Sequence, residues 1–176
     1  MGGKTRIRSF APVADRNARV LILGSMPGRE SLEKRQYYAF KHNVFWRIII
    51  ELLRLDPSTS YRGRIRALKA ARIALWDVLE SCLREGSSDA TIENEVANDF
   101  GNFFRSHRRI VRVFFNGAKA QICFKRHVAN GLGARIFSFK RLPSSSPANA
   151  SLSFARKRDA WRVILEPVRT GGGSRK

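Results

Sequence analysis

The chain has 176 residues, a length that suits one domain with a hydrophobic core of its own. Its 34 lysines and arginines against 14 aspartates and glutamates give a formal net charge of +20. We therefore expect an anionic partner, with nucleic acid first and an anionic membrane surface second; a basic surface that only aids solubility is the alternative. The absence of any run of 18 apolar residues excludes a membrane-spanning helix, and the basic start of the chain lacks the apolar stretch of a secretory signal.

The two cysteines, Cys82 and Cys123, lie in apolar stretches without metal-binding spacing, which predicts buried free thiols in a reducing compartment. The three histidines form no ligand pattern, so we expect neither a metal nor another cofactor. The Gly-rich stretch 170–176 predicts a flexible tail. The expected single domain, 1–176, then has its core at about 18–168, behind a basic N-terminal arm.

Four runs rich in β-branched or aromatic residues predict strands at about 19–24, 72–78, 110–115 and 134–140. Apolar periodicity predicts helices at Asn43–Leu53, Ala118–Val128 and Phe154–Leu165, and one with Ile92, Val96, Phe100, Phe103 and Phe104 on a single face. Alternation of strands and helices predicts an α/β fold, a three-layer α/β/α sandwich with a central, mainly parallel four-stranded sheet. Ligands of such sheets bind beyond the carboxyl ends of the strands, where Gly24, Asp77, Asn116 and the loop after Pro143 are expected.

Two segments near the first strand carry the strongest chemical signal. Gly24-Ser25-Met26-Pro27-Gly28 follows the apolar run 19–23 and reads as a tight turn whose backbone N–H groups face a ligand. About ten residues later, Tyr37-Tyr38-Ala39-Phe40-Lys41-His42-Asn43-Val44-Phe45-Trp46 supplies aromatic rings and an amide. An aromatic platform with an amide beside a strand end suits a nucleobase.

These segments resemble motif 1 of the uracil-DNA glycosylase superfamily, whose mismatch-specific branch has Gly-Ile-Asn-Pro-Gly and then Phe-Ala-His-Pro-x-Asn-x-Phe-Trp. The Gly-Ser-Met-Pro-Gly and Gln-Tyr-Tyr-Ala forms are more similar to the hypoxanthine-DNA glycosylase branch. Two further segments also resemble that branch: Ala74–Val78 with Cys82, Arg84, Gly86, Ser87 and Asp89, and Leu142–Asn149 at the place of motif 2. The resemblance covers about residues 18–165. It implies a monofunctional DNA glycosylase that hydrolyses the N-glycosidic bond of a deaminated base (hypoxanthine, uracil or xanthine) and so initiates base excision repair.

The resemblance implies a base pocket formed by Ser25, Met26, Tyr38, Asp77 and Ser144. Tyr38 aligns with the base-stacking aromatic residue; its alternative is a core tyrosine. Asp77 aligns with the asparagine that reads uracil, and an ionised Asp77 would accept from N1–H of hypoxanthine or N3–H of uracil. Its alternative is a structural carboxylate that caps a helix or pairs with an arginine. Ser144 replaces a histidine that stabilises the leaving base, and it carries no charge.

Asn43 is the expected catalytic residue, which holds the attacking water. Other branches use an Asp or Asn at the position of Met26, where a thioether cannot orient water well. In the hypoxanthine branch, the later asparagine takes this role. The alternative is an N-cap for the helix that follows, and both roles are compatible.

DNA contacts are expected from Ser145, Ser146, Pro147, Ala148, Asn149 and Arg156. Ala148 and Asn149 stand where the superfamily inserts a wedge into the base stack, and neither is large and apolar. An ordinary helix start, with Ser146 as cap, is the alternative. Further candidates for phosphate contacts are Lys157, Arg158 and Arg162 on the last helix and Arg108, Arg109 and Arg112 near the third strand.

The expected partner is DNA, single- or double-stranded, with no membrane and no obligate protein partner, in the cytoplasm near the nucleoid. One rival function is a nucleic-acid-binding protein that keeps the fold without catalysis. A second rival, an enzyme acting on free nucleosides, is disfavoured because a small substrate needs no wide basic surface.

Overall fold

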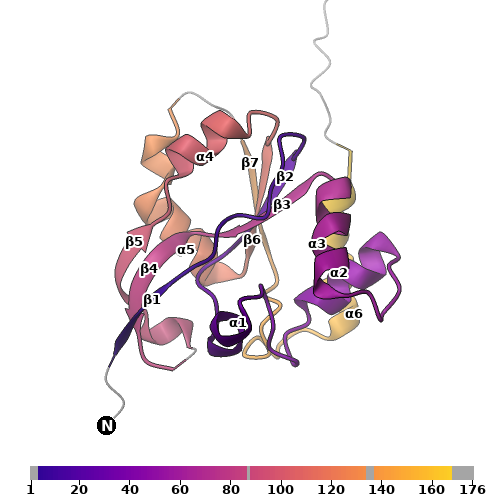
Figure 1. Ribbon diagram of the computed structural model, residues 1–176, viewed down its shortest axis with the longest axis horizontal. Helices are drawn as coiled ribbons and strands as arrows, with labels where there is room; N and C mark the ends of the chain where they lie inside the picture. Colours follow the sequence, from indigo (N-terminus) through magenta and orange to yellow (C-terminus); the bar gives the residue numbers. More distant parts are fainter. Residues whose placement is uncertain (1–3, 87, 134–136, 168–176) are drawn as a thin grey trace, which may run out of the picture.

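Figure 1 shows a computed structural model of the chain, which describes residues 4–86, 88–133 and 137–167. Its centre is a parallel sheet with the strand order β3-β2-β6-β7. The strands are β2 (Val20–Gly24), β3 (Ile73–Asp77), β6 (Arg112–Asn116) and β7 (Ser138–Leu142). The predicted four parallel strands are confirmed, while positions 134–136 of the predicted last strand lie outside the described residues.

Helices cover both faces of this sheet, as predicted for a three-layer sandwich. One face carries α2 (Phe45–Leu53), α3 (Tyr61–Ala70) and α6 (Phe154–Trp161), which Figure 1 shows together on one side. The other face carries α4 (Phe100–Ser106) and α5 (Ala118–His127). A short helix, α1 (Arg29–Lys34), follows β2, and 3₁₀ turns lie at Asp89–Thr91, Ala129–Gly131 and Arg162–Leu165.

Alternate residues of each strand enter different hydrophobic clusters. In β2, Leu21 and Leu23 pack with α4 and α5, whereas Val20 and Ile22 pack with α2, α3 and α6. All five residues of β2 and all five of β3 are buried. Burial on both faces explains why these strands read as continuous apolar runs rather than as alternating patterns.

The predicted helix through Ile92, Val96 and Phe100 is wrong. Residues Glu93–Ala97 form a strand, β5, and α4 begins only after Asp99, whose carboxylate accepts the N–H of Asn102 at 2.9 Å. Val96, expected on the buried face, is 45% exposed. Ile92 and Phe100 do share one hydrophobic cluster, but they reach it from two different elements, so the helical spacing is coincidental.

A second sheet, which was not predicted, packs beside the first. Its order is β1-β4-β5, with β1 (Thr5–Arg8) and β5 both antiparallel to β4 (Leu79–Arg84). Since β4 follows β3 after one residue, this sheet extends directly from the carboxyl end of β3.

Cys82 and Cys123 are buried free thiols, as expected. Within the described ranges, no helix has the length and apolar character needed to cross a membrane.

Candidate active site at the carboxyl edge of the sheet

The predicted site lies where β2 and β3 end side by side, with Gly24 opposite Asp77 in the register. The pairing continues past the strand ends, because Val78 N–H donates to the Gly24 carbonyl at 2.9 Å and Leu79 N–H to the Ser25 carbonyl at 3.2 Å. The start of the Gly24–Gly28 turn is therefore held as firmly as the sheet itself.

Gly24 allows two polar side chains to approach its Cα. A Cβ at this position would lie 2.4 Å from Asp77 Oδ1 and 2.9 Å from the Tyr38 hydroxyl oxygen. Such distances do not occur with a real Cβ, so a glycine is required here by space rather than by backbone conformation. The Asp77 carboxyl group and the Tyr38 hydroxyl group thus converge on one point above Gly24.

The Asp77 carboxyl group is buried without a counterion in contact. Asp77 is only 3% exposed, its Oδ2 has no hydrogen-bond partner, and it takes part in none of the ion pairs formed among the described residues. The Arg84 guanidinium donates instead to the carbonyls of Pro27 at 2.6 Å and Gly86 at 3.1 Å. Its charge therefore reaches Asp77 only through space.

Burial raises the pKa of Asp77 from its ordinary value of 3.8 to about 7; the nearby Asp89 adds to this rise and Arg84 opposes it. A substantial fraction of Asp77 is then protonated at neutral pH. This corrects the expectation of an ionised, acceptor-only carboxylate, because a neutral carboxyl group also donates a hydrogen bond.

Three buried polar atoms of the described residues have no hydrogen-bond partner, and they belong to Tyr38, Asp77 and Arg84. Buried polar groups are normally paired, so atoms left without partners need an explanation such as a bound ligand or water. Two of the three residues meet above Gly24, and Arg84 acts electrostatically on Asp77. Their concentration in one region indicates a site built to receive polar groups.

A buried polar network holds the turn after Gly24 in place. The Ser25 hydroxyl donates to both carboxylate oxygens of Asp89 at 2.9 Å, and Arg84 holds the Pro27 carbonyl. Burial of its carboxyl group raises the pKa of Asp89, although the residue as a whole is exposed. The Ser25 hydroxyl is therefore already engaged in this structure. Met26 is 7% exposed and packs in the hydrophobic cluster of α4 and α5.

Tyr38 is supported from one side and partly open on the other. Its ring stacks on Phe45 with centroids 4.0 Å apart and an interplanar angle of 22°. Burial raises the pKa of its hydroxyl, which stays protonated. The preceding Tyr37 is a core residue: it is 4% exposed, its hydroxyl donates to the Ala11 carbonyl at 3.1 Å, and its carbonyl accepts from Trp46 Nε1 at 2.7 Å.

Asn43 lies one residue before Val44, the N-cap of α2, so the alternative of Asn43 as the N-cap is wrong; it still binds the start of the helix and lines an open hollow. Its Oδ1 accepts the N–H of Phe45, the first residue of α2, at 3.0 Å. It lies with Tyr38 in the wall of a hollow of about 450 Å³ next to α2 and α3; Ser25, Met26, Asp77 and Ser144 do not line this hollow. Tyr38 therefore lines the hollow and also reaches, with its hydroxyl group, the point above Gly24 where the Asp77 carboxyl group lies.

The segment at the place of motif 2 is pinned beside Asn43. Ser145 is fully buried, and it exchanges two hydrogen bonds of 2.8 Å with the Asn116 side chain at the end of β6. Its carbonyl accepts the N–H of Val44 at 3.1 Å. Ser145 thus joins the two motifs, and its hydroxyl does not face outward in this structure. Ser144 packs against Gly117, whose positive φ of 92° and lack of a Cβ leave room for it.

The rest of this loop is held by α6. Lys157, which is 5% exposed, donates to the carbonyls of Asn149 at 2.6 Å and Ser146 at 3.5 Å, and Trp161 Nε1 donates to the Pro143 carbonyl at 2.9 Å. No helix starts at Ser146, because α6 begins at Phe154 behind its cap Ser153. Pro147, Ala148 and, on α6, Arg156 are exposed, whereas Ser146 and Asn149 are half-buried.

Sequence reasoning did not assign a positioning role to Arg84, Asn116, Lys157 or Trp161, and the expected phosphate contact of Lys157 is wrong because that residue is only 5% exposed and binds loop carbonyls. Asn116 was expected at a strand end, but its bonds to Ser145 span 29 positions. Arg108, Arg109 and Arg112 lie before or at the start of β6, at the opposite edge of the sheet. Arg112 is also bound to the carbonyls of Val163 and Glu166.

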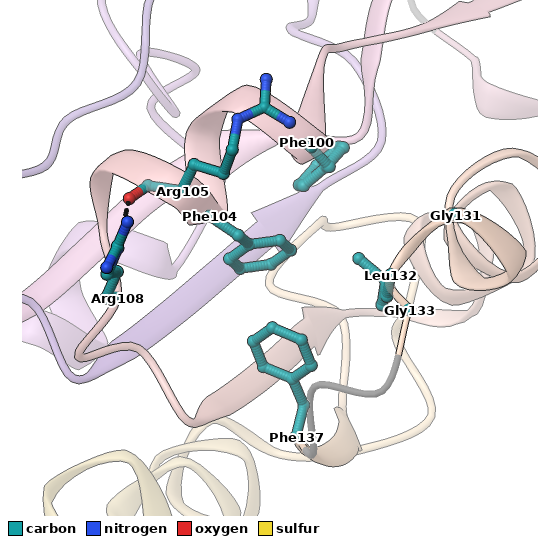
Figure 2. Close-up of a pocket in the computed structure, with 9 residues that line it drawn as sticks. Phe100, Phe104, Arg105, Arg108, Gly131, Leu132, Gly133 and Phe137 are labelled. Carbon is teal, nitrogen blue, oxygen red and sulfur yellow. Dashed lines mark hydrogen bonds between the residues drawn. The ribbon is translucent and has the colours of Figure 1, made fainter.

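A second hollow, of about 500 Å³, lies away from this edge between α4 and the turn Ala129–Gly131 (Figure 2). Phe104 and Phe137 pack against each other in its wall with ring centroids 4.6 Å apart, and Arg108 Nε donates to the Arg105 carbonyl at 3.3 Å. None of the predicted site residues lines it. Nowhere in the described ranges do three His, Cys, Asp or Glu side chains gather as metal ligands would.

Comparisons with known proteins place this geometry in a family. The model of the uracil DNA glycosylase superfamily matches residues 11–166. Two proteins called hypoxanthine DNA glycosylase, from Methanosarcina acetivorans and Methanosarcina barkeri, are each 37% identical to this chain; the alignments cover 90% and 88% of it and 97% and 94% of the relatives. A solution NMR structure from M. acetivorans, described as a candidate uracil DNA glycosylase, superposes with a TM-score of 0.77 at 36% identity, covering 92% of this chain and 98% of the other.

The contact above Gly24 yields a first prediction. Gly24→Ala should place a methyl group against Asp77 and Tyr38 and lower the catalytic efficiency by about tenfold or more, because displacements of about 1 Å are costly in active sites. Gly28→Ala is the matched control, since a Cβ there meets nothing within 4 Å. Single-turnover kinetics of both variants on damaged DNA measure the effect, and equal kinetics would contradict the tight contact.

The burial of Asp77 yields a second prediction, on stability. Between about pH 4 and 7 only the folded chain keeps the Asp77 proton, so the wild-type free energy of unfolding should fall as the pH rises through this window. In Asp77→Asn the side chain at this position does not titrate, so this pH dependence is absent. The stability of this variant relative to wild type should therefore rise from pH 4 to 7 by up to about 4 kcal/mol and then level off. Urea unfolding at a series of pH values measures this difference, and parallel curves for the two proteins would refute it.

Proposed function

The chain belongs to the uracil DNA glycosylase superfamily and is a DNA glycosylase, and we propose that hypoxanthine is the base it removes from DNA by hydrolysis of the N-glycosidic bond. The names of the two Methanosarcina relatives support this choice of base. The observation that carries the mechanism is the Asp77 carboxyl group, buried without a counterion in contact beside Gly24 and Tyr38.

A base that leaves from the sugar takes the bonding electrons with it. The bond between C1′ and N9 of hypoxanthine breaks, the sugar develops oxocarbenium character, and negative charge spreads over the base to O6. A hydrogen bond donated to O6 is stronger in the transition state than in the ground state, because O6 gains negative charge. Such a bond therefore lowers the activation barrier and accelerates the reaction. Water then adds to C1′ and gives up a proton, which yields free hypoxanthine and an abasic sugar.

We assign this donor role to the neutral Asp77 carboxyl group. A carboxylate would repel the developing anion, whereas the protonated form donates its O–H to O6 and can accept from N1–H. A carboxylic acid kept neutral by an apolar site and used as a donor is a known solution to this problem. Asp77 would then compensate for Ser144, which replaces the histidine expected to stabilise the leaving base.

Tyr38 would hold the flipped base by stacking. Its ring rests on Phe45, and Phe45 in turn contacts the rings of Trp46 and Trp161. Such a rigid stack keeps the remaining face of Tyr38 fixed for a base, at roughly 1–3 kcal/mol for each stacked base. The base must leave the duplex to reach this face.

Asn43 would position the water. Met26 is buried among apolar residues and offers no polar group, whereas Asn43 lines the hollow next to Tyr38. The bond from Phe45 N–H fixes the orientation of the Asn43 side chain, because Oδ1 is anchored at the start of α2. The bond to Phe45 and water binding are compatible, since an amide oxygen has a second lone pair and the amide nitrogen donates separately.

The DNA backbone would run along the exposed part of the motif 2 loop. Ser146, Pro147, Ala148 and Asn149 present hydroxyl, amide and backbone groups there, and Arg156 adds an exposed charge from α6. Contacts of this kind set the position of the strand rather than its sequence. A net charge of +20 favours DNA over free nucleosides as substrate.

Replacement of Asn43 tests its role in catalysis. Asn43→Ala should lower single-turnover release of hypoxanthine by roughly 10²-fold or more, the scale for loss of one key polar group. Loss of its hydrogen bond from Phe45 N–H should also cost about 1 kcal/mol of stability.

A cap variant elsewhere separates these two effects. Ser60 caps α3 by accepting the Gly63 N–H at 3.2 Å, so Ser60→Ala should lose similar stability and keep its activity. Equal activities of Asn43→Ala and Ser60→Ala would show that Asn43 only stabilises the start of α2.

The pH profile tests the donor role of Asp77. Release of hypoxanthine should decline as the pH rises above about 7, as Asp77 ionises beside Tyr38, Arg84 and Asp89. Asp77→Asn keeps one donor and one acceptor without titrating, so its rate should stay flat over this range.

Asp77→Ala should be slow at every pH, by roughly tenfold or more, because one well-placed hydrogen bond is lost. A wild-type profile that persists unchanged in Asp77→Asn would assign the pH dependence to another group.

A further inference from the structure

We propose that Phe40 is the residue that enters the base stack of duplex DNA when the damaged nucleotide is flipped out; this inference rests on the proposed function. Glycosylases that act on duplex DNA must unstack the target base, and an apolar side chain inserted between base steps lowers that cost. The loop after Pro143, expected to supply such a wedge, has only Ala148 and Asn149 at the corresponding positions.

Phe40 is an aromatic side chain displayed to solvent at the edge of the site. It is 39% exposed, and it is one of five large hydrophobic residues of the described chain that are exposed to this degree. The other four are Val96, Ile122, Phe139 and Leu165. Phe40 alone among them lies between Tyr38, which would hold the base, and Asn43, which would hold the water. An exposed aromatic ring costs solubility, so its position beside both groups points to a ligand with stackable rings.

The backbone around Phe40 is fixed before DNA arrives. Ala39 N–H donates to the Ser31 hydroxyl at 3.1 Å, and the Phe40 carbonyl accepts the Asn43 N–H at 2.9 Å, which closes the turn of residues 40–43. The ring of His42 meets the ring of Phe40 edge to face, with centroids 5.2 Å apart and an angle of 77°. The Phe40 ring is therefore presented on a closed turn and steadied by its neighbour.

The turn also lies against the segment where a wedge is expected. Val44 N–H donates to the Ser145 carbonyl at 3.1 Å, so the two loops are joined directly. Phe40 would approach the same gap in the stack from the other side of the base site. The wedge function is thus transferred from the Ser146–Asn149 loop to the turn of residues 40–43.

The surroundings of Phe40 favour a polyanion. Lys41, Arg47 and Arg64 line the same hollow as Phe40, with Glu51 as its one acidic residue. Lys41 is exposed, Arg47 is exposed and ion-paired with Glu51, and Arg64 is half-buried and donates to the Thr59 carbonyl. Cations next to an aromatic ring are the combination that proteins use to bind phosphates and to stack bases on the same strand.

The test compares duplex and single-stranded DNA with one deoxyinosine each. A wedge matters only where a stack must be opened. Phe40→Ala should therefore lose about tenfold or more in single-turnover excision from the duplex, the scale of one lost aromatic–base stack, and stay within about twofold on the single strand. Phe40→Trp should retain duplex activity. Ile122→Ala, which removes a side chain that is 48% exposed on α5, is the control and should change neither rate.

A second readout does not depend on chemistry. With 2-aminopurine next to a 2′-fluorinated deoxyinosine that resists hydrolysis, wild type should raise the fluorescence by unstacking its neighbour, and Phe40→Ala should raise it less. Equal losses on duplex and single strand would assign Phe40 a merely structural role and overturn the proposal, as would unchanged duplex activity or no fluorescence rise with wild type. If wild type unstacks the duplex but excises nothing, the proposed function fails while the wedge stands.

Discussion

A carboxyl group that is buried without a counterion in contact is the constraint on which the site depends. Removing an ionised carboxylate from water costs far more than one hydrogen bond returns, so the group responds by taking up a proton. Gly24 leaves the space for Asp77, while Arg84 is held on the carbonyls of Pro27 and Gly86. The arrangement keeps Asp77 near the midpoint of its titration at neutral pH. A chain that needed only a structural ion pair here would place the guanidinium in contact with the carboxylate.

Rigid support surrounds this group. The parallel sheet brings Gly24, Asp77 and Asn116 to one edge, and Asn116 fixes Ser145 by two hydrogen bonds. From α6, Lys157 and Trp161 donate hydrogen bonds to backbone carbonyls of the same loop. Because these bonds form before the substrate binds, little reorganisation remains for the reaction itself. The exposed turn with Phe40 is attached to this support through Val44 and Ser145.

The sequence predicted most of the central fold, because strands buried on both faces leave continuous apolar runs and amphipathic helices leave a 3.6-residue period. It failed at 92–104, where Ile92, Val96 and Phe100 have helical spacing although Ile92 precedes a strand, Val96 lies in that strand and Phe100 begins a helix. Glu95 shows why no pattern marks this strand: its carboxylate faces inward to Lys119, Arg126 and His127. A polar residue on the buried face breaks the period-2 signal of a strand.

The candidate site was predictable in its residues but not in their states. Motif spacing identified Tyr38, Asn43 and Asp77, yet the protonation of Asp77 depends on burial and on Arg84 and Asp89, which only the tertiary structure brings near. The sequence predicted that Asn43 binds the start of α2, because such bonds are local, although Val44 rather than Asn43 is the N-cap. Lys157 was not, since a lysine on a helix is ordinarily a solvated residue and here it is 5% exposed.

The titration of the Asp77 carboxyl carbon tests the central claim most directly. Carbon-13 NMR of the protein labelled at aspartate Cγ, with Asp77→Asn to assign the signal, follows this carbon through the pH range. We expect a midpoint near 7, well above those of exposed aspartates. A midpoint near 4 would mean that Asp77 is ionised at neutral pH, and the neutral donor to the leaving base would then have to be abandoned.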